Sequence, residues 1–335
     1  MSEVLLRVEH VSKRFPVRRT LGDRAHRRGG QWVTAVDDVS FALGKGETFG
    51  VVGESGSGKS TLARCLVRLH EADEGTIDFD GIDVRRADRD GGRTLHQRVQ
   101  MVFQDPYTSL NPRFSIESAI LEAGRVHGRV EKGGGDAFVQ ELLTMVGLPT
   151  RLASRRPREL SGGQRQRVAI ARALAVGPDL LVADEAVSSL DVSIQAQILN
   201  LFEELRQQLG LTMIFISHQL SVISHISDSV AIMYLGRIVE LGPTTQVFTS
   251  PRHPYTRGLL DANPTPDPRQ RHRQPALSGE LPSPLAIPTG CRFRTRCAFA
   301  ADVCAAVDPE LAAVGDGHST ACHVLPFGSD RPTAS

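Results

Sequence analysis

Hydrophobic residues along the 335-residue chain follow two patterns, short continuous runs and runs with helical spacing. The short runs are rich in β-branched residues and predict strands at 4–11, 36–43, 47–52, 99–103, 180–183 and 212–216. Apolar residues that recur every three or four positions predict helices at 61–69, 162–175 and 194–209. Two further runs flank Leu235-Gly236 and predict a hairpin. Because strands alternate with helices, we expect an α/β fold with a mainly parallel core sheet.

Two stretches depart from this alternation. Residues 110–175 show no strand pattern and predict a helical subdomain, interrupted by three glycines at 133–135 and by Pro149. Thirteen of the 19 prolines fall within 243–335, a density that disfavours a regular sheet or long helices. We therefore expect a first domain over 1–242 and a small irregular C-terminal domain over 243–335.

Charge and composition exclude several classes of protein. Lys and Arg number 39 against 38 Asp and Glu, so no overall field attracts nucleic acid, and we expect no nucleic-acid partner. No run of 18 uncharged apolar residues predicts a membrane-spanning helix, and residues 1–20 lack the apolar core of a signal peptide, which favours the cytoplasm. Most basic residues are arginine, so we interpret the cluster at 18–28 and the alternating Arg292, Arg294 and Arg296 as solvated surface.

A phosphate-binding pattern follows the third predicted strand. Residues 53–60 read Gly-Glu-Ser-Gly-Ser-Gly-Lys-Ser, which is the P-loop sequence, and the next residues open a predicted helix. Glycines allow backbone N–H groups to turn toward phosphate oxygens, and the helix N-terminus adds positive potential. We expect Lys59 to reach the β- and γ-phosphates and the Ser60 hydroxyl to bind Mg²⁺.

Two acids end the strand predicted at 180–183. In a P-loop enzyme an aspartate at this place orients Mg²⁺, and a second carboxylate can position the attacking water. Asp184 and Glu185 fit these two roles.

A glycine-rich sequence at 160–164, Leu-Ser-Gly-Gly-Gln, precedes the helix predicted at 162–175. Together with the P-loop it resembles the signature motif of ATP-binding-cassette (ABC) ATPases. The resemblance extends over residues 1–242: Phe15 matches the aromatic that stacks on adenine, Gln104 the Q-loop, the sequence ending at Asp191 the D-loop, and His218 the switch histidine. It implies a RecA-like α/β core, an N-terminal antiparallel β subdomain and a helical signature subdomain.

The resemblance also implies the site. Two nucleotide-binding subunits would pack head to tail, with the signature of one facing the P-loop of the other across ATP. Glu185 would polarise the attacking water, and His218 and Gln104 would complete the catalytic group. The residues implied in nucleotide binding are Phe15, Gly53, Glu54, Ser55, Gly56, Ser57, Gly58, Lys59, Ser60, Thr61, Gln104, Ser161, Gly162, Gly163, Gln164, Asp184 and Asp191, with Ser60, Gln104 and Asp184 holding Mg²⁺.

The chain departs from the family pattern at two positions. Ala186 stands where a proline usually follows the catalytic glutamate, and Gln219 where an aspartate often follows the switch histidine. Neither change removes a catalytic group, but both affect the fine geometry of the site.

The C-terminal 93 residues resemble the corresponding region of oligopeptide and dipeptide importer ATPases, specifically the second of their two paralogous ATPase subunits. The resemblance is carried by His-Pro-Tyr-Thr at 253–256, Gly-Glu-Leu-Pro-Ser-Pro at 279–284 and a cysteine-bearing stretch that begins at 290. It implies a paralogous ATPase partner, two membrane permeases and an extracytoplasmic solute-binding protein, at the cytoplasmic face of the membrane. The alternative is a soluble, non-transport ABC ATPase.

Four of the five cysteines lie in this region, with the spacing Cys-x5-Cys-x6-Cys-x17-Cys: Cys291, Cys297, Cys304 and Cys322. Four thiolates suit zinc or an iron–sulfur cluster. The close Cys pairs of most structural zinc sites are absent, which favours a cluster, and the resemblance implies a four-iron four-sulfur cluster. Zinc and free or paired thiols remain alternatives. Cys65, within the helix at 61–69, is expected to be a small buried residue.

Overall fold

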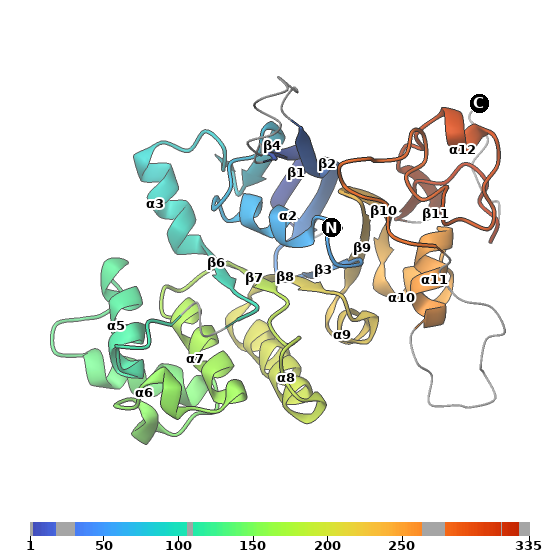
Figure 1. Ribbon diagram of the computed structural model, residues 1–335. Helices are drawn as coiled ribbons and strands as arrows, with labels where there is room; N and C mark the ends of the chain where they lie inside the picture. The colour runs from blue at the N-terminus through green and yellow to red at the C-terminus, as the bar shows by residue number, and fades with distance from the viewer. Residues whose placement is uncertain (1–2, 18–30, 106–109, 263–278, 316, 328–335) are drawn as a thin grey trace, which may run out of the picture.

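The computed structural model describes residues 3–17, 31–105, 110–262, 279–315 and 317–327, which form two β-sheets and three groups of helices (Figure 1). The smaller sheet has the order β2 (Trp32–Gly44), β1 (Val4–Pro16), β4 (Glu74–Phe79), β5 (Ile82–Asp83), and all its pairings are antiparallel. The cluster of basic residues at 18–28 lies outside the described residues. An antiparallel N-terminal β subdomain is therefore confirmed.

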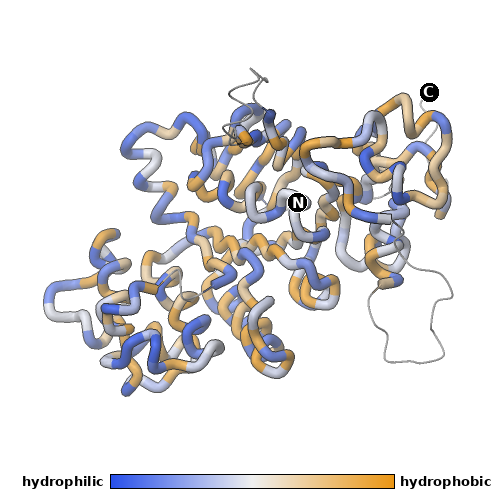
Figure 2. The backbone as a smooth tube through the Cα atoms, in the orientation of Figure 1, coloured by the Kyte–Doolittle hydropathy of each residue, from blue (hydrophilic) through white to orange (hydrophobic). Residues whose placement is uncertain are grey.

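The larger sheet supplies the core. Its eight strands are, in order, β11 (Ala312–Gly315), β12 (His318–Thr320), β10 (Arg237–Pro243), β9 (Ser229–Tyr234), β3 (Thr48–Val52), β8 (Thr212–Ser217), β7 (Leu180–Asp184) and β6 (Val99–Val102). The run from β9 to β6 is parallel, and every residue of β3, β7 and β8 is buried. Continuous apolar runs produce such strands because both sheet faces are covered. Figure 2 shows the hydrophobic residues along these strands.

One set of helices covers the larger sheet, and a second set forms a separate group. The helices of the core are α2 (Lys59–Leu66), α3 (Arg89–Arg98), α8 (Val192–Leu209) and α9 (Leu220–Ile226). The separate group comprises α5 (Ile116–Val126), α6 (Gly135–Met145), two short 3-10 turns at Thr150–Leu152 and Pro157–Glu159, and α7 (Gly162–Leu174). This group lies below and to the left of the sheet in Figure 1 and is the expected helical subdomain. No helix within the described ranges has the length and apolar character needed to cross a membrane.

The two sheets and the helical group share two apolar cores. The β-subdomain core joins the larger sheet where the rings of Phe41 and Phe49 stack, with their centroids 4.5 Å apart. The second core runs from the helical subdomain through the sheet and reaches Phe293 in the C-terminal region. Because this region shares the main core, it does not depend on an apolar core of its own.

The C-terminal region continues the larger sheet rather than forming a separate layer. Its helices α10 (Thr244–Thr249), α11 (Pro254–Ala262) and α12 (Val303–Ala306) are short, and β12 pairs with β10. Glu240 of β10 is fully buried and accepts hydrogen bonds from the backbone N–H of Arg252 and His253, while its other contact is His318 Nε2 at 2.7 Å. A buried carboxylate with several partners fixes this region to the sheet edge.

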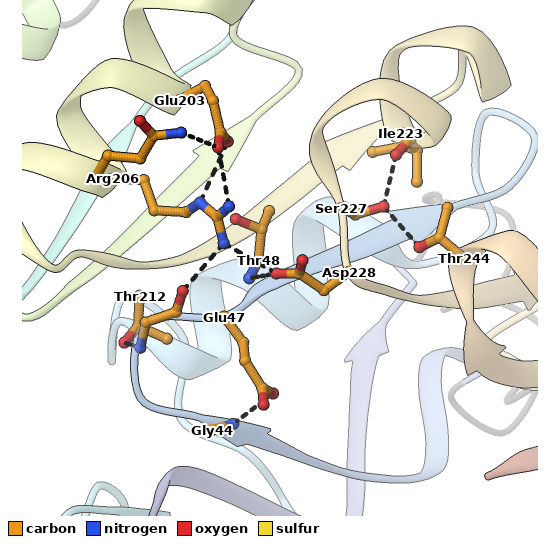
Figure 3. A network of polar contacts seen from close by, with 12 residues as sticks. Gly44, Glu47, Thr48, Glu203, Arg206, Thr212, Ile223, Ser227, Asp228 and Thr244 are labelled. Carbon is orange, nitrogen blue, oxygen red and sulfur yellow. Dashed lines mark hydrogen bonds and ion pairs between the residues drawn. The ribbon is translucent and has the colours of Figure 1, made fainter. Parts of the chain in front are cut away.

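A polar network stabilises the end of the sheet remote from the P-loop (Figure 3). Asp228 accepts a hydrogen bond from the backbone N–H of Thr48 at 2.8 Å and one from Arg206 Nη1 at 3.1 Å. Arg206 also donates to Glu203 on α8. The start of β3 is thereby tied to α8 and to the loop before β9, which fixes the strand that delivers the P-loop.

Candidate functional site

The P-loop connects β3 to α2 in a conformation that requires glycine. Gly58 has φ = 103°, and a Cβ added there would lie 2.0 Å from the carbonyl oxygen of Ala35. A Cβ at Gly53 would lie 2.2 Å from the carbonyl oxygen of Met233. Strands β2 and β9 therefore approach the loop so closely that only glycine fits.

The Lys59 side chain folds back and binds the backbone of the P-loop. Its side chain is buried, and Nζ donates hydrogen bonds to the carbonyl oxygens of Gly53 at 2.8 Å and Glu54 at 3.0 Å. Burial lowers the pKa of Lys59, while the nearby acids Glu185 and Asp184 act in the opposite direction. The site thus presents a desolvated cation that lacks a fully compensating anion, which is suited to phosphate.

Ser60 and Asp184 meet across the sheet edge. The Ser60 hydroxyl donates to Asp184 Oδ1 at 2.8 Å. Burial raises the pKa of Asp184 above its ordinary value, and the hydrogen bond from Ser60 opposes this shift. A hydroxyl and a buried carboxylate in contact form an oxygen donor set of the kind that Mg²⁺ prefers.

Glu185 lies between two predicted catalytic partners. Gln104 Nε2 donates to its Oε2 at 3.0 Å, and His218 Nδ1 lies 3.3 Å from the same oxygen. Glu185 has φ = 48°, an uncommon conformation for a residue with a side chain. The three side chains come from three different segments and converge at the carboxyl edge of the parallel strands, where ligands bind in such sheets.

The two departures from the family pattern leave this group intact. Ala186, in the usual proline position, is buried. Gln219 accepts a hydrogen bond from Gln195 Nε2 at 2.8 Å, and its backbone N–H donates to Ser217 Oγ at 2.9 Å. Gln219 is therefore engaged with α8 rather than with His218.

Most of the P-loop residues after Glu54 line one cavity together with Gln104 and Glu185. Its remaining lining comes from β2, from Leu235 and from the C-terminal region; the lining residues are Val33, Thr34, Ala35, Ser55, Gly56, Gly58, Lys59, Ser60, Thr61, Gln104, Glu185, Leu235, Pro284 and Ile287. Ser57 is buried, and its backbone N–H donates to the carbonyl oxygen of Glu54. Phe15 pairs with Val33 in the β1–β2 ladder, and its ring packs edge-on against His70. The expected adenine-stacking residue thus borders the strand that lines the cavity.

The signature motif starts α7. Ser161 caps the helix: its hydroxyl accepts from the Gln164 backbone N–H at 3.3 Å, and Gln164 Oε1 accepts from the Ser161 N–H at 3.0 Å. A Cβ on Gly163 would lie 2.6 Å from Ile194 of α8, a helix that follows Asp191. Among the described residues, the signature side chains are not part of the lining of the P-loop cavity. The motif therefore lies beside its own D-loop.

The four C-terminal cysteines line one small cavity. No disulfide joins them or Cys65, all of which are described, and Cys65 is buried as expected. Burial raises the pKa of Cys291 to about 11, with a further contribution from the other three thiols. Over the described ranges, no three or more His, Cys, Asp or Glu side chains are arranged to hold a metal ion. The four cysteines therefore border one cavity, but within the described ranges they do not form a metal site.

The interpretation of the alternating arginines as solvated surface is wrong for two of them. Arg292 and Arg296 are buried, whereas Arg294 is partly exposed. Arg292 donates to Asp37 and to the carbonyl oxygen of Leu235, and Arg296 forms an ion pair with Glu54. Contacts with residues far away in the chain desolvate both side chains, and the local sequence pattern carries no information about these contacts.

Comparisons with known proteins identify the family of this chain. Residues 36–188 match the family model described as ABC transporter, and residues 239–304 match the C-terminal region of oligopeptide/dipeptide transporters. The oligopeptide transport ATP-binding protein AppF of Bacillus subtilis is 47% identical over 325 residues, 96% of this chain and 98% of that protein. The chain belongs to the ATP-binding proteins of the oligopeptide/dipeptide ABC importer family. A probable peptide ABC transporter ATP-binding protein of Sinorhizobium fredii, y4tS, is 48% identical over 97% of this chain and 91% of its own length.

Solved ABC structures match the fold of this family member. CbiO1 from Clostridium perfringens, part of the ABC transporter complex cbiONQ, superimposes with a TM-score of 0.62 at 27% identity and covers 74% of this chain and 92% of its own. The cassette MJ0796, in a dimeric post-hydrolysis state bound to ADP and Pi, gives a TM-score of 0.61 at 25% identity, covering 71% of this chain and 98% of its own. The protein is accordingly an ABC ATPase, which hydrolyses ATP to drive transport.

Proposed function

We propose that this ATPase powers a bacterial importer for peptides or related small solutes, paired with a paralogous ATPase and two permeases at the cytoplasmic face of the membrane. Two observations together support this proposal. Gln104 and His218 both contact Glu185, and the C-terminal region is of the oligopeptide/dipeptide transporter type. Relatives that cover almost the whole chain are described as peptide or oligopeptide transport proteins. An extracytoplasmic binding protein would deliver the solute to the permeases. The proposal includes two domains, residues 1–242 and residues 243–335.

The proposed residue roles follow from the contacts around the cavity. Lys59 binds the β- and γ-phosphates, exchanging its bonds to loop carbonyls for phosphate oxygens. Ser60, Gln104 and Asp184 would hold Mg²⁺, which supplies neutralisation of phosphate charge when bound. Glu185 accepts a proton from the attacking water. His218 contacts the γ-phosphate.

The proposed active unit is a head-to-tail pair. Ser161, Gly162, Gly163 and Gln164 form a helix N-terminus with backbone N–H groups available for phosphate. Their position outside the lining of their own P-loop cavity supports a role at the partner's nucleotide, with Asp191 at the interface. One subunit alone would hold half of each site.

The proposed permease contact is a groove between the larger sheet and the helical subdomain. Val102, Phe103 and Val126 are among its apolar lining residues, and Glu122 and Arg172 add charge. Phe103 immediately precedes Gln104, so an element seated in the groove would touch the segment that carries a catalytic side chain. Phe114, 42% exposed, lies farther along the same segment.

Val126 offers a direct test of the groove, since 64% of its surface is exposed. Val126→Asp places a charge against an apolar partner surface, and we expect recovery of permeases from native membranes with the tagged chain to fall at least about tenfold. ATP binding should stay unchanged. Leu209→Asp, at the end of α8 and 44% exposed, is the matched control and should recover permeases normally. Equal recovery with both variants, or no permease with the wild-type chain, would contradict the proposal.

The cavity lined by the four cysteines is proposed to hold a four-iron four-sulfur cluster, with zinc as the alternative. In support, the four thiols line one cavity. Because the pKa of Cys291 is raised, its thiol must release a proton to become a ligand. When bound, such a cluster would cross-link the region.

Metal analysis after strictly anaerobic purification distinguishes the candidates. We expect iron and acid-labile sulfide in equal amounts, about four of each per chain. Cys304→Ala should lose both, while Cys65→Ala, a buried cysteine elsewhere, should keep both. One zinc per chain without iron would establish the alternative, and wild-type protein free of both metals would refute both assignments.

A further inference from the structure

The C-terminal region contacts the P-loop at Glu54, the second residue of the motif. Arg296 donates to both carboxylate oxygens of Glu54, from Nη1 at 2.7 Å and from Nη2 at 3.0 Å. The backbone N–H of Glu54 donates to the Tyr255 hydroxyl at 2.9 Å. Both the side chain and the backbone of this P-loop residue are thus bound by residues that follow β10.

Burial makes the Arg296 contact a strong one. The Arg296 side chain is 6% exposed and the Glu54 side chain 27%. The hydrogen bond to Glu54 raises the pKa of Arg296, so the guanidinium remains charged. A bidentate, partly desolvated ion pair of this kind fixes the relative orientation of the two side chains and also stabilises their contact.

A packed group of aromatic rings lies behind the Arg296–Glu54 ion pair. The Phe293 ring lies 5.5 Å from that of Tyr255 and 5.4 Å from that of Tyr234, measured between centroids. Tyr234 and Tyr255 are fully buried. The Arg296 guanidinium lies 5.9 Å from the centroid of the Tyr234 ring, so Arg296 and Tyr255 both present their polar atoms to Glu54 from this packed group.

A second arginine of the same segment contacts another wall of the nucleotide cavity. Arg292 donates to the carbonyl oxygen of Leu235, which lines the cavity, and to Asp37, two residues beyond the lining residue Ala35. Farther upstream, Pro284 and Ile287 line the cavity themselves. Figure 1 shows the C-terminal region on the β10 side of the larger sheet, where β9 separates β10 from the P-loop strand β3.

We propose that Arg296 is a positioning residue for nucleotide binding, which acts through Glu54. By fixing Glu54 it preorganises the first turn of the P-loop, whose backbone N–H groups and Lys59 receive the phosphates. The proposal rests on this cavity being the nucleotide site and is independent of what the cysteines bind. It assigns the C-terminal region a direct part in ATP affinity.

The test uses the full chain and compares ATP affinity with turnover. Arg296→Gln removes the charge at similar size, and we expect the Kd for ATP and the KM to rise about tenfold, with kcat within about twofold of wild type. Arg296→Lys, which retains the charge and one contact point, should recover part of the affinity. Arg257→Gln is the matched control, because this arginine of α11 pairs with Asp261 and should not affect the Kd.

A double-mutant cycle separates positioning from general destabilisation. Glu54→Gln should weaken ATP binding to a similar extent, and in the Arg296→Gln background it should add little, because both changes break the same contact. Additive losses, or an Arg296→Gln protein with lowered melting temperature but wild-type KM, would overturn the proposal. If the wild-type chain itself fails to bind ATP, the nucleotide site is wrong rather than the role of Arg296.

Discussion

Replacement of Glu185 by glutamine is expected to slow steady-state ATP hydrolysis about a thousandfold while ATP binding stays near wild type. Glutamine keeps the shape of the side chain and an acceptor for Gln104 Nε2, which lies 3.0 Å from Glu185 Oε2. It cannot accept a proton from the attacking water. Since Lys59 and Ser60 are untouched, the loss should fall on kcat rather than on the Kd for ATP.

Phosphate release under excess MgATP and equilibrium dialysis with labelled ATP measure the two quantities. Glu204→Gln, an exposed glutamate of α8, is the matched control and should hydrolyse ATP at the wild-type rate. Phosphate release at the wild-type rate by the Glu185→Gln protein would remove Glu185 from its assigned role. Loss of ATP binding in that protein would indicate that the carboxylate supports the loop instead.

The second large effect is expected for Gly58→Ala. The new Cβ would lie 2.0 Å from the carbonyl oxygen of Ala35, so the loop or β2 must move. The residue also has φ = 103°, outside the range that L-residues favour. We expect the free energy of unfolding to fall by about 4 kcal/mol and the Kd for ATP to rise at least about a hundredfold.

Gly46→Ala isolates the conformational part of this effect. Gly46 has φ = 74°, and no atom lies within 4 Å of a Cβ placed there. The Gly46→Ala substitution should lower the free energy of unfolding by only about 1 kcal/mol and leave ATP binding unchanged. Urea unfolding and ATP titration compare the two variants. Equal effects of both substitutions on stability and binding would show that β2 does not constrain the P-loop.

The parallel core and the grouping of most candidate site residues could be predicted from the sequence. Buried parallel strands such as β3, β7 and β8 are continuous apolar runs, and the segments that follow them carry the polar residues of the site. The P-loop and signature are local patterns whose glycines and caps determine their own backbone. The hairpin at Leu235-Gly236 was equally predictable, because its turn residues stand between two apolar runs.

Elements with few apolar residues were not predictable. Helix α3 buries Gly92 and Leu95, and Leu95 is its one large apolar side chain, so its sequence contains too few apolar residues to indicate a helix. Strand β4 alternates weakly, and its pairing with β1 decides its structure. Tertiary contacts, rather than intrinsic propensity, select these elements.

The C-terminal contribution to the site depends on contacts between distant residues. Arg296 and Glu54 are far apart in the chain, and the local alternation of arginines is the same for a solvated face and for a buried contact. Pro284 and Ile287 lie in a proline-rich stretch with no recognisable motif, yet they line the P-loop cavity. The pairing of β10 with β12 and the shared core bring this region to the candidate site.

Peptide uptake by the reconstituted importer tests directly whether this ATPase powers import. The chain, its paralogous ATPase and two permeases are placed in liposomes, and a binding protein loaded with labelled peptide is added on the opposite side from MgATP. We predict that the loaded binding protein increases phosphate release and that peptide accumulates only with ATP. Both signals should disappear with the Glu185→Gln chain. Phosphate release that is indifferent to permeases and binding protein, with no peptide accumulation, would contradict the account.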